Sequence, residues 1–335
     1  MSIEISELTP DDREQWDSYV EQSPYASLFH RYDALEVLSE HAEAPLHPLV
    51  GFKGQEPVGL FPVFEVSKGP LTAAFSPPPR LAVPFLGPAL LNLGKLKQRK
   101  AERRHRRFVD GCLERVTEEI GPRYSKFGLG CAYDDIRPFK WNDYRLTPWY
   151  TYLLDLTGGP EIIERFSSDA RRNIRDGDGV SFAIEEGGVE AAERIIRQVR
   201  RRHENQNRPF GPTAAYVADL YERLPEGTVR PYVCRVEGEF VGGIVALEDD
   251  DTVYRWQGGV RPETDTDLAV NDHLDWHVMS EAIDRGLDAY DLVGAGTPRI
   301  NEYKAKINPA VQTFFTVEHG TWPVTTLVNL YRRLA

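Results

Sequence analysis

The chain of 335 residues carries 52 Asp and Glu residues against 40 Lys and Arg residues, which gives a net charge of −12. This charge argues against a general nucleic-acid or DNA binder, because such proteins present a basic surface to the phosphate backbone. The sequence contains no run of about 18 apolar residues, so it predicts no membrane-spanning helix. The N-terminus lacks the basic and apolar regions of a signal peptide, so we expect a cytoplasmic protein.

Arginine outnumbers lysine by 31 to 9, so the acidic surface is poor in lysine. Such a composition favours a halophilic-type surface, because high salt screens the repulsion between like charges. The three cysteines are far apart and show no metal-binding spacing, so we expect buried free thiols.

The N-terminal half predicts a mixture of helices and strands. Thr9-Pro10 is typical of a helix start, and a tight turn at Lys53–Glu56 joins two strands in HPLVGFKGQEPVGLFPVFEV. The predicted elements, in chain order, are a strand at 3–5, helices at 9–20 and 31–41, the hairpin at 47–66, an extended proline-broken segment at 77–90, a long helix at 96–120, and the strands KFGLG and PWYTYLLDL.

The C-terminal half predicts a similar mixture. We expect Asn271 or Asp267 to cap a helix that ends at Gly286, and the last predicted helix is VTTLVNLYRRL. The other predicted elements are helical pieces at 160–176, the strand VSFAIEEG, helices at 189–205 and 213–224, three antiparallel strands within 230–260, and the strands AYDLVG and QTFFTVEHG.

The two halves share a repeated hairpin. HPLVGFKGQEPVGLFPVFE resembles RPYVCRVEGEFVGGIVALE at an offset of 183 or 184 residues, and a helix with a tyrosine precedes each copy. Pro48 aligns with Pro231, and Gly54 aligns with Gly238. The repeat predicts two copies of one α+β unit, each with a mostly antiparallel sheet.

Six segments of the second half follow an order that resembles the FemAB-like branch of the GNAT-related acyltransferases. They are SSDARRNIRDGDG, RRHENQN, EGEFVGGIVAL, VYRWQGGV, LAVNDHLDWHVMSEAIDRGLDAYDLVGAG and EYKAKI, the last standing where the family usually has a Tyr-Lys or Phe-Lys pair. The resemblance covers most of the chain and implies a double GNAT-like fold. It also implies transfer of an acyl or aminoacyl group to an amine. We expect tandem GNAT-like units at residues 1–155 and 156–335.

Lys304 is the strongest catalytic candidate, because it follows a predicted strand and a Gly-rich loop in a lysine-poor chain. A lysine there can place a positive charge on a phosphate or on a developing oxyanion. Tyr303 can give a proton to a leaving group, and Asp291 can orient an amine. The alternatives are a surface lysine and an Asp291 that pairs with a nearby arginine.

Other residues are predicted to bind substrate. Gly258, in a Gly-Gly pair at a strand end, permits a β-bulge whose N–H groups bind an oxyanion, although a plain turn is the alternative. Tyr254 and Trp256 either line an acceptor cleft or pack in the core. We include Asn271 with this group.

Basic clusters are the candidates for binding anions. One comprises Arg171, Arg172 and Arg175, and another includes Arg201 and His203. A third, Lys95-Arg107, could contact tRNA or an anionic membrane that holds a lipid-linked acceptor. For each cluster the alternative is a solvated helix face.

The donor stays open between acyl-CoA and aminoacyl-tRNA. RPETDTDLAVNDHL stands where an ordinary GNAT has a Gly-rich pyrophosphate loop, and its four acids repel a pyrophosphate. We expect no tightly bound cofactor and no metal, since His273 and His277 lack an evident third ligand. The acceptor is an amine on an envelope sugar, a lipid-linked precursor or a peptide. The rival interpretation is a non-catalytic binding protein that kept the fold.

Overall fold

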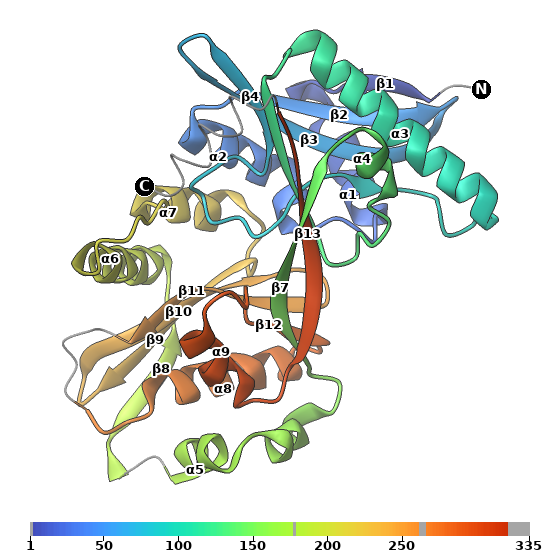
Figure 1. The fold of residues 1–335 in the computed structure, drawn as a ribbon. Coiled ribbons are helices and arrows are strands. Elements are labelled where there is room, and N and C mark those ends of the chain that lie inside the picture. Colours follow the sequence, from blue (N-terminus) through green and yellow to red (C-terminus); the bar gives the residue numbers. More distant parts are fainter. Residues whose placement is uncertain (1–2, 177–178, 261–265, 321–335) are drawn as a thin grey trace. The chain divides into compact units, whose positions relative to one another are not determined.

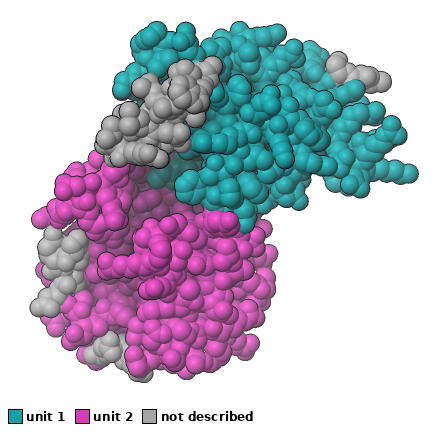
Figure 2. Space-filling model, viewed as in Figure 1, with its two compact units in different colours: residues 1–149, 313–335 teal, residues 150–312 magenta. Residues whose placement is uncertain are grey.

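The computed structural model describes residues 3–176, 179–260 and 266–320 (Figure 1). The chain forms two compact units (Figure 2). Unit 1 comprises residues 1–149 and 313–335, and unit 2 comprises residues 150–312.

Unit 1 is built on a sheet in the order β1-β2-β3-β4-β6-β13, with the short β5 beside β3. Its strands are β1 (Glu4–Glu7), β2 (Leu46–Lys53), β3 (Glu56–Lys68), β4 (Leu71–Ser76), β5 (Ala89–Leu90), β6 (Tyr124–Leu129) and β13 (Ala310–Gly320). Its helices are η1 (Pro10–Asp12), α1 (Arg13–Gln22), η2 (Leu28–His30), α2 (Tyr32–Ala42), α3 (Gln98–Glu119) and α4 (Arg137–Trp141).

Unit 2 is built on a sheet in the order β8-β9-β10-β11-β12-β7. Its strands are β7 (Arg145–Asp155), β8 (Phe182–Glu186), β9 (Val229–Val236), β10 (Glu239–Glu248), β11 (Thr252–Val260) and β12 (Ala289–Asp291). Its helices are η3 (Gly159–Arg165), α5 (Ser168–Asp176), α6 (Val189–Asn205), α7 (Ala214–Arg223), α8 (Val270–Asp284) and α9 (Pro298–Ala305).

The two sheets have the same strand order and directions. In unit 1 the pair β4–β6 is parallel and the other neighbours are antiparallel; in unit 2 the pair β11–β12 is parallel and the others are antiparallel. Two α-helices separate the first two strands of each sheet. A long α-helix directly precedes β6 in unit 1 and β12 in unit 2, the later strand of each parallel pair. The predicted α+β class with two similar, mostly antiparallel units is confirmed.

The repeated hairpin occupies the same place in each sheet. It forms β2–β3 in unit 1 and β9–β10 in unit 2, with strand pairs in antiparallel register. Gly54 and Gly238 both adopt positive φ in the two-residue turns, the conformation that tight hairpins require and that glycine tolerates best. Both hairpins thus have a two-residue turn with a glycine, which makes the repeat visible in the sequence, although Gly54 is the first turn residue and Gly238 the second.

The sixth strand of each sheet departs from simple chain order. β7 follows the helices of the first half but pairs with β12 of unit 2, whereas β13 follows the second half and pairs with β6 of unit 1. The chain therefore passes between the units twice, at 149/150 and at 312/313. The sequence predicts a single boundary at 155/156. Strand pairing over such separations leaves no local signal in the sequence.

Apolar stripes explain how the helices cover the sheets. In α6 the buried residues Ala192, Ile195, Ile196 and Val199 recur at the spacing of one helix face. The core of unit 2 joins residues of β9, β10 and β12 with residues of α8, and a separate core in unit 1 joins α3 with β3 and β6. Each unit thus has its own hydrophobic core.

Several local predictions differ from the structure. Ala269, not Asn271 or Asp267, is the N-cap of α8. The segment with Tyr303 and Lys304 is the helix α9, which begins with Pro298 at its first turn. The predicted last helix, VTTLVNLYRRL, lies outside the described residues. Among the described helices, none has the length and apolar character needed to span a membrane.

Candidate functional site

The parallel strands β11 and β12 pair over three positions only. Thr252 to Tyr254 lie opposite Ala289 to Asp291, and β12 ends there while β11 continues to Val260. Beyond Tyr254 this edge of β11 therefore has no strand partner among the described residues.

A β-bulge lies in β11 beside this edge. Leu247 pairs with Tyr254 and Val245 with Gln257, so β11 has one residue more than β10 between these pairs. The bulge does not form at Gly258, where the sequence permits either a bulge or a plain turn; Gly258 lies in β11 and pairs regularly with Ile244. A Cβ atom on Gly258 would lie 2.3 Å from the carbonyl oxygen of Gly243. Glycine is needed there for close strand approach rather than for a turn.

A buried carboxylate, Asp275 on α8, is the centre of a polar cluster. Arg255 of β11 donates from Nε to Oδ1 of Asp275 at 2.5 Å, and Tyr290 of β12 donates to the same oxygen at 2.7 Å. Tyr303 of α9 donates to Oδ2 at 2.5 Å. We call Arg255, Asp275, Tyr290 and Tyr303 the Asp275 cluster. It ties four elements together where β11 and β12 part.

Burial and charge set the protonation states of the Asp275 cluster. Burial raises the pKa of Tyr303 well above its ordinary value, and the negative charge of Asp275 raises it further. Burial lowers the pKa of Arg255, but the carboxylate of Asp275 outweighs this effect and the pKa is raised. Tyr303 is therefore a neutral phenol and Arg255 a cation at neutral pH.

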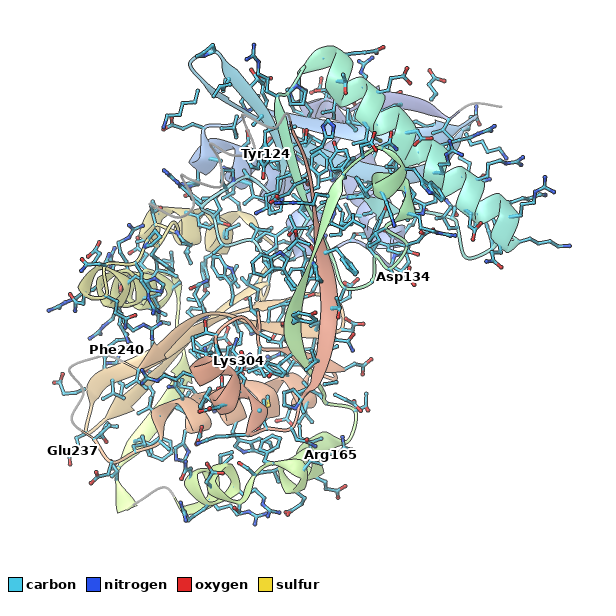
Figure 3. All side chains as sticks on the ribbon, viewed as in Figure 1. Tyr124, Asp134, Arg165, Glu237, Phe240 and Lys304 are labelled. Atoms are coloured by element: carbon cyan, nitrogen blue, oxygen red, sulfur yellow. The ribbon has the colours of Figure 1, made fainter. Side chains whose placement is uncertain are left out.

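Lys304 lies next to this cluster on α9 and holds the loop after β12 (Figure 3). Its Nζ donates to the carbonyl oxygens of Leu292, Val293 and Gly294 at 2.7, 3.0 and 2.6 Å. An ammonium group has three N–H donors, so these bonds use all of them. Burial lowers the pKa of Lys304 to about 8, and the charge of Arg255 contributes.

Asp291, at the end of β12, fixes the other side of the same loop. Its Oδ1 accepts from the hydroxyl of Thr151 at 2.5 Å and from the backbone N–H of Val293 at 2.7 Å. Burial raises the pKa of this carboxyl group. The arginine partner of the alternative interpretation is absent from these contacts, and Asp291 instead joins β7 to the loop after β12.

A small pocket opens beside Lys304 within unit 2. Asp272, Asp275 and Tyr303 contribute polar groups to its wall. Asp272 accepts a hydrogen bond from Asn173 of α5 at 2.6 Å, so this wall includes the predicted basic helix. The remaining lining residues are Ala170, Ile174, Leu292, Lys304 and Ile307.

The arginines of α5 are largely engaged with one carboxylate. Arg171 and Arg175 both form ion pairs with Glu164. Arg172 is exposed, and the described residues give it no ion pair. Of the three predicted anion-binding arginines, Arg172 is the one whose charge is not already compensated.

In the second basic cluster, Arg202 rather than Arg201 points toward β11. Arg201 is exposed, whereas Arg202 is half-buried and donates to the carbonyl oxygen of Gly258 at 3.3 Å. Burial lowers the pKa of Arg202, and the nearby charge of Arg255 lowers it further. No carboxylate pairs with Arg202 among the described residues. His203 packs against the ring of Phe210.

The remaining predicted substrate residues have separate positions. Trp256 is 3% exposed and packs edge-on against Tyr216 of α7. Tyr254 is half-buried on the same strand. Asn271 accepts a hydrogen bond from Arg255 at 3.3 Å, which places it beside the Asp275 cluster. The structure thus brings Asn271, Tyr303, Lys304 and Asp291 to one end of β12, and packs Trp256 into the core.

The acidic segment between β11 and α8 is only partly described. Residues 261–265, with Glu263 and Asp265, lie outside the described residues. Asp272, the last of its four acids, is buried in the first turn of α8 beside Asn173. The predicted repulsion of a pyrophosphate at this place stays a prediction.

These features define a class of protein. Residues 165–305 match the family model described as an acetyltransferase (GNAT) domain, and this match lies within unit 2. No curated protein matches the sequence significantly. Residues 165–305 are therefore similar to a GNAT domain, and the parallel strands that separate within this region are β11 and β12.

Solved structures extend the likeness to the whole chain. The crystal structure of FemX matches with a TM-score of 0.70 and 12% identity over 93% of this chain and 96% of that chain. The structure of L-PGS from Bacillus licheniformis matches with a TM-score of 0.57 and 12% identity over 96% of each chain. A tandem GNAT protein from the clavulanic acid biosynthesis pathway, solved without AcCoA, matches with a TM-score of 0.53 and 12% identity over 96% of this chain and 99% of that chain. The predicted double GNAT-like fold is confirmed.

Sequence reasoning missed three residues of this region, namely Asp275, Arg255 and Arg202. The sequence does contain a signal for Arg202. Positions 202 and 203 come three and four residues after Val199, so they lie on the same buried face of α6. Asp275 has no comparable signal, because α8 is buried on several sides and its sequence shows no single apolar face.

Proposed function

We propose that this protein is an N-acyltransferase that moves an acyl or aminoacyl group to an amine of the cell envelope. The main support for this proposal is that β11 and β12 separate beside Tyr303 and Lys304. This separation lies within the region that matches the GNAT family model. The acceptor is an amine on a sugar, a lipid-linked precursor or a peptide. The names of FemX and L-PGS among the solved structures of similar fold favour such acceptors.

In the proposed reaction the edge of β11 that lacks a strand partner binds the donor carbonyl. Attack by the neutral amine converts that carbonyl oxygen into an oxyanion, which backbone N–H groups and nearby positive charge stabilise. Arg255 and Lys304 supply the positive field, while their hydrogen bonds hold them in place. The amine then loses a proton, and the donor's thiol or hydroxyl oxygen leaves with a proton.

The proposed role of Lys304 follows from its three carbonyl contacts. Because all its donors are occupied, Lys304 acts first as a positioning residue that shapes the loop from Leu292 to Gly294. It contacts an oxyanion directly only if one carbonyl bond is exchanged. Tyr303 is similarly committed to Asp275, since a phenol has one proton to donate.

Arg202 and Arg172 are the proposed binding groups for an anionic part of the donor or acceptor. Both arginines lack a carboxylate partner among the described residues, and Arg202 lies against β11 beside Gly258. A guanidinium that is half-buried without a counter-ion is costly, and an incoming phosphate or carboxylate would remove that cost.

The long helix α3 is the proposed contact with an anionic membrane. Its first turns expose Lys97, Arg99, Lys100 and Arg103, whereas Arg104 and His105 turn inward. Trp141, which is 54% exposed, lies under Arg106. Exposed basic groups around an aromatic ring suit the headgroup region of an anionic bilayer. Contact with tRNA is the alternative for the same surface.

A transfer assay with two donors and three acceptors tests the proposal. Labelled acyl-CoA and labelled aminoacyl-tRNA are each offered with an amino sugar, a lipid-linked precursor and a peptide amine. We expect transfer from one donor to one acceptor class, and loss of that transfer in Lys304→Met. If neither donor gives product while ligands still bind in calorimetry and filter-binding assays, the protein is a binding protein with a GNAT-like fold.

A further inference from the structure

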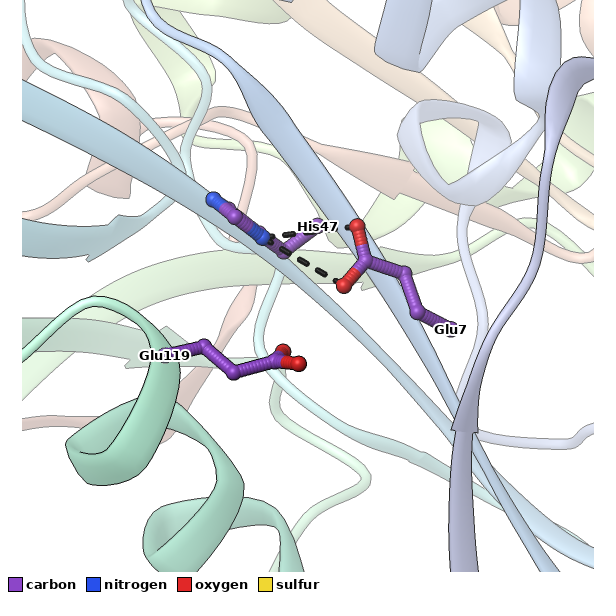
Figure 4. A group of neighbouring side chains, drawn as sticks. All are labelled: Glu7, His47 and Glu119. Atoms are coloured by element: carbon purple, nitrogen blue, oxygen red, sulfur yellow. Dashed lines mark hydrogen bonds and ion pairs between the residues drawn. The ribbon is translucent and has the colours of Figure 1, made fainter.

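A histidine and two glutamates lie close together in unit 1, whereas the Asp275 cluster belongs to unit 2. Glu7 ends β1, His47 lies near the start of β2, and Glu119 is the last residue of α3. One potential ligand atom from each residue lies within 4.8 Å of the other two, and among the described residues this is the only such group of three. Figure 4 shows the three side chains converging from three elements.

The charges around this group favour a cation. Glu65 of β3 joins it as a third carboxylate, because its Oε2 lies 3.5 Å from Nε2 of His47. Arg115 pairs with Oε1 of Glu119 and leaves the other oxygen of that carboxylate available. Glu119 also lies at the C-terminus of α3, where the backbone carbonyls carry partial negative charge. Three carboxylates thus face one arginine and one histidine.

The two nitrogens of His47 have different neighbours. Nδ1 lies 3.4 Å from Oε1 and 3.5 Å from Oε2 of Glu7. Nε2 faces Glu65, and it is buried from solvent without a hydrogen bond of normal length. A histidine that ligates a metal with one nitrogen usually donates its other N–H to a carboxylate. Glu65 stands where that second carboxylate is required.

We propose that Glu7, His47 and Glu119 form a binding site for a divalent transition metal, with Zn²⁺ as the best match. Nδ1 of His47 and one oxygen from each glutamate are the ligands, and Glu65 orients His47 through Nε2–H. Two ligating carboxylates balance the charge of the ion. This site is separate from the acyl-transfer proposal and does not depend on it.

The ligand types decide which metal fits. Zn²⁺ takes imidazole nitrogen and carboxylate oxygen at about 2.0–2.2 Å, in tetrahedral sites that leave one position for water. Mg²⁺ and Ca²⁺ prefer sets made of oxygen alone, so the imidazole disfavours them. Small side-chain rotations bring ligand atoms from 4.8 Å to tetrahedral spacing, since all three side chains are partly exposed. Glu119 is exposed, so an ion can reach the site from solvent.

The sequence predicts no metal site, because these three ligands lack the short spacing that is typical of metal-binding motifs. The three residues come from β1, β2 and α3, and the strand register sets their approach. Glu7 pairs with Leu49 and His47 pairs with Val63, so Glu7 and Glu65 lie diagonally on either side of His47. Such diagonal neighbours are within reach of long side chains.

Metal titration of the whole chain tests the site. The protein is first stripped with a chelator, and Zn²⁺, Co²⁺ and Mg²⁺ are then titrated separately at pH 7.5 in a calorimeter. We expect one equivalent of Zn²⁺ to bind, Co²⁺ to give the intense visible absorption of a tetrahedral site, and Mg²⁺ not to compete. Zn²⁺ should also raise the melting temperature.

Variants locate the binding. His47→Gln and Glu119→Gln should each weaken Zn²⁺ binding by about 100-fold or more, and Glu65→Gln by roughly 10- to 100-fold, the usual cost of losing an outer-shell partner. Glu118→Gln is the matched control, because Glu118 is exposed beside Glu119 on α3. Circular dichroism without metal checks that each variant folds. The proposal is overturned if no stoichiometric Zn²⁺ binding occurs, or if His47→Gln and Glu119→Gln bind Zn²⁺ like the unmodified chain.

Discussion

Tyr303 donates its hydroxyl hydrogen bond to Asp275 at 2.5 Å, and this bond joins α9 to α8. The same carboxylate accepts from Arg255, a cation buried in the same cluster. The Tyr-Lys pair that the family resemblance singles out is therefore held by a carboxylate that lies 28 residues earlier in the chain. Stability and site geometry are linked through Asp275.

Replacing Asp275 with Asn should strongly destabilise the protein. The change leaves Arg255 buried without a counter-charge, which typically costs about 3–5 kcal/mol. Tyr303→Phe should cost only about 1–2 kcal/mol, because it removes one hydrogen bond to Oδ2 while Arg255 and Tyr290 still bind Oδ1. Urea denaturation measures both values. Asp284→Asn, an exposed position on the same helix, is the control. A stable Asp275→Asn protein would contradict the buried ion pair.

Replacing Lys304 with Met should lower turnover and loosen the loop after β12. Loss of the charge should reduce kcat roughly 100-fold, the scale of one electrostatic contact to a developing oxyanion. Amide exchange between Leu292 and Gly296 should become faster, since three carbonyl bonds are lost. Lys306→Met is the matched control, because Lys306 makes one half-exposed ion pair with Asp169. Unchanged turnover with faster exchange would leave Lys304 only a structural role.

The pH dependence of stability should also reveal Lys304. Burial lowers its pKa to about 8, against 10.5 for an unperturbed lysine. Between these two values the unfolded chain binds more protons than the folded chain, so this group makes the free energy of unfolding rise with pH. The slope reaches about 1.4 kcal/mol per pH unit at most. Below pH 8 the lysine is protonated in both states, and its contribution is constant.

Denaturation of the unmodified chain and of Lys304→Met, each measured from pH 7 to 10.5, checks this expectation. The free energy of unfolding of the unmodified chain should rise relative to that of Lys304→Met above pH 8. Other titrating groups affect both proteins and largely cancel in the difference. A difference that stays constant across this range would mean that the pKa of Lys304 is not lowered.

Much of the fold could be predicted because its signals are local. The hairpins of β2–β3 and β9–β10 show alternating apolar residues and a glycine at each turn, and α6 shows a regular apolar stripe. The exchange of β7 and β13 could not be predicted, because pairing between distant segments depends on the completed sheets. The helix α9 was missed although Thr297-Pro298 is a helix-start signal.

The candidate site was predictable in part for a related reason. Lys304 stands out by composition and by the family resemblance. Asp275 does not, because it is one acid among several in a helix with no single apolar face, and only the packing of α8 selects it for burial. The metal-site residues are separated by whole elements, so only the sheet register brings them together.

Replacing Arg202 with Gln should weaken ligand binding without lowering stability. Arg202 is half-buried with no carboxylate partner among the described residues, so removing its charge does not break an ion pair. If it binds an anionic group, affinity should fall by about 10- to 100-fold, the effect of losing one hydrogen bond to a charged group. Arg201→Gln, at the exposed neighbouring position, is the control. Equal affinity in the two variants would remove Arg202 from the binding site.

Replacing Gly258 with Ala should destabilise unit 2 severely. Its backbone has φ +151, and an added Cβ would lie 2.3 Å from the carbonyl oxygen of Gly243 and 2.7 Å from the Cα of Ile244. These are backbone atoms of the adjacent strand, so β10 and β11 must separate to admit the methyl group, at a cost of more than about 2 kcal/mol.

Gly238→Ala provides the comparison for that change. Gly238 also has positive φ, but no atom lies within 4 Å of a Cβ built on it, so only backbone strain of about 1 kcal/mol is expected. Urea denaturation of both variants distinguishes the cost of a clash with the adjacent strand from the cost of backbone strain at positive φ. If Gly258→Ala is no less stable than Gly238→Ala, the two strands do not approach as closely as the structure places them. Arg202 would then lose its fixed position at the Gly258 carbonyl.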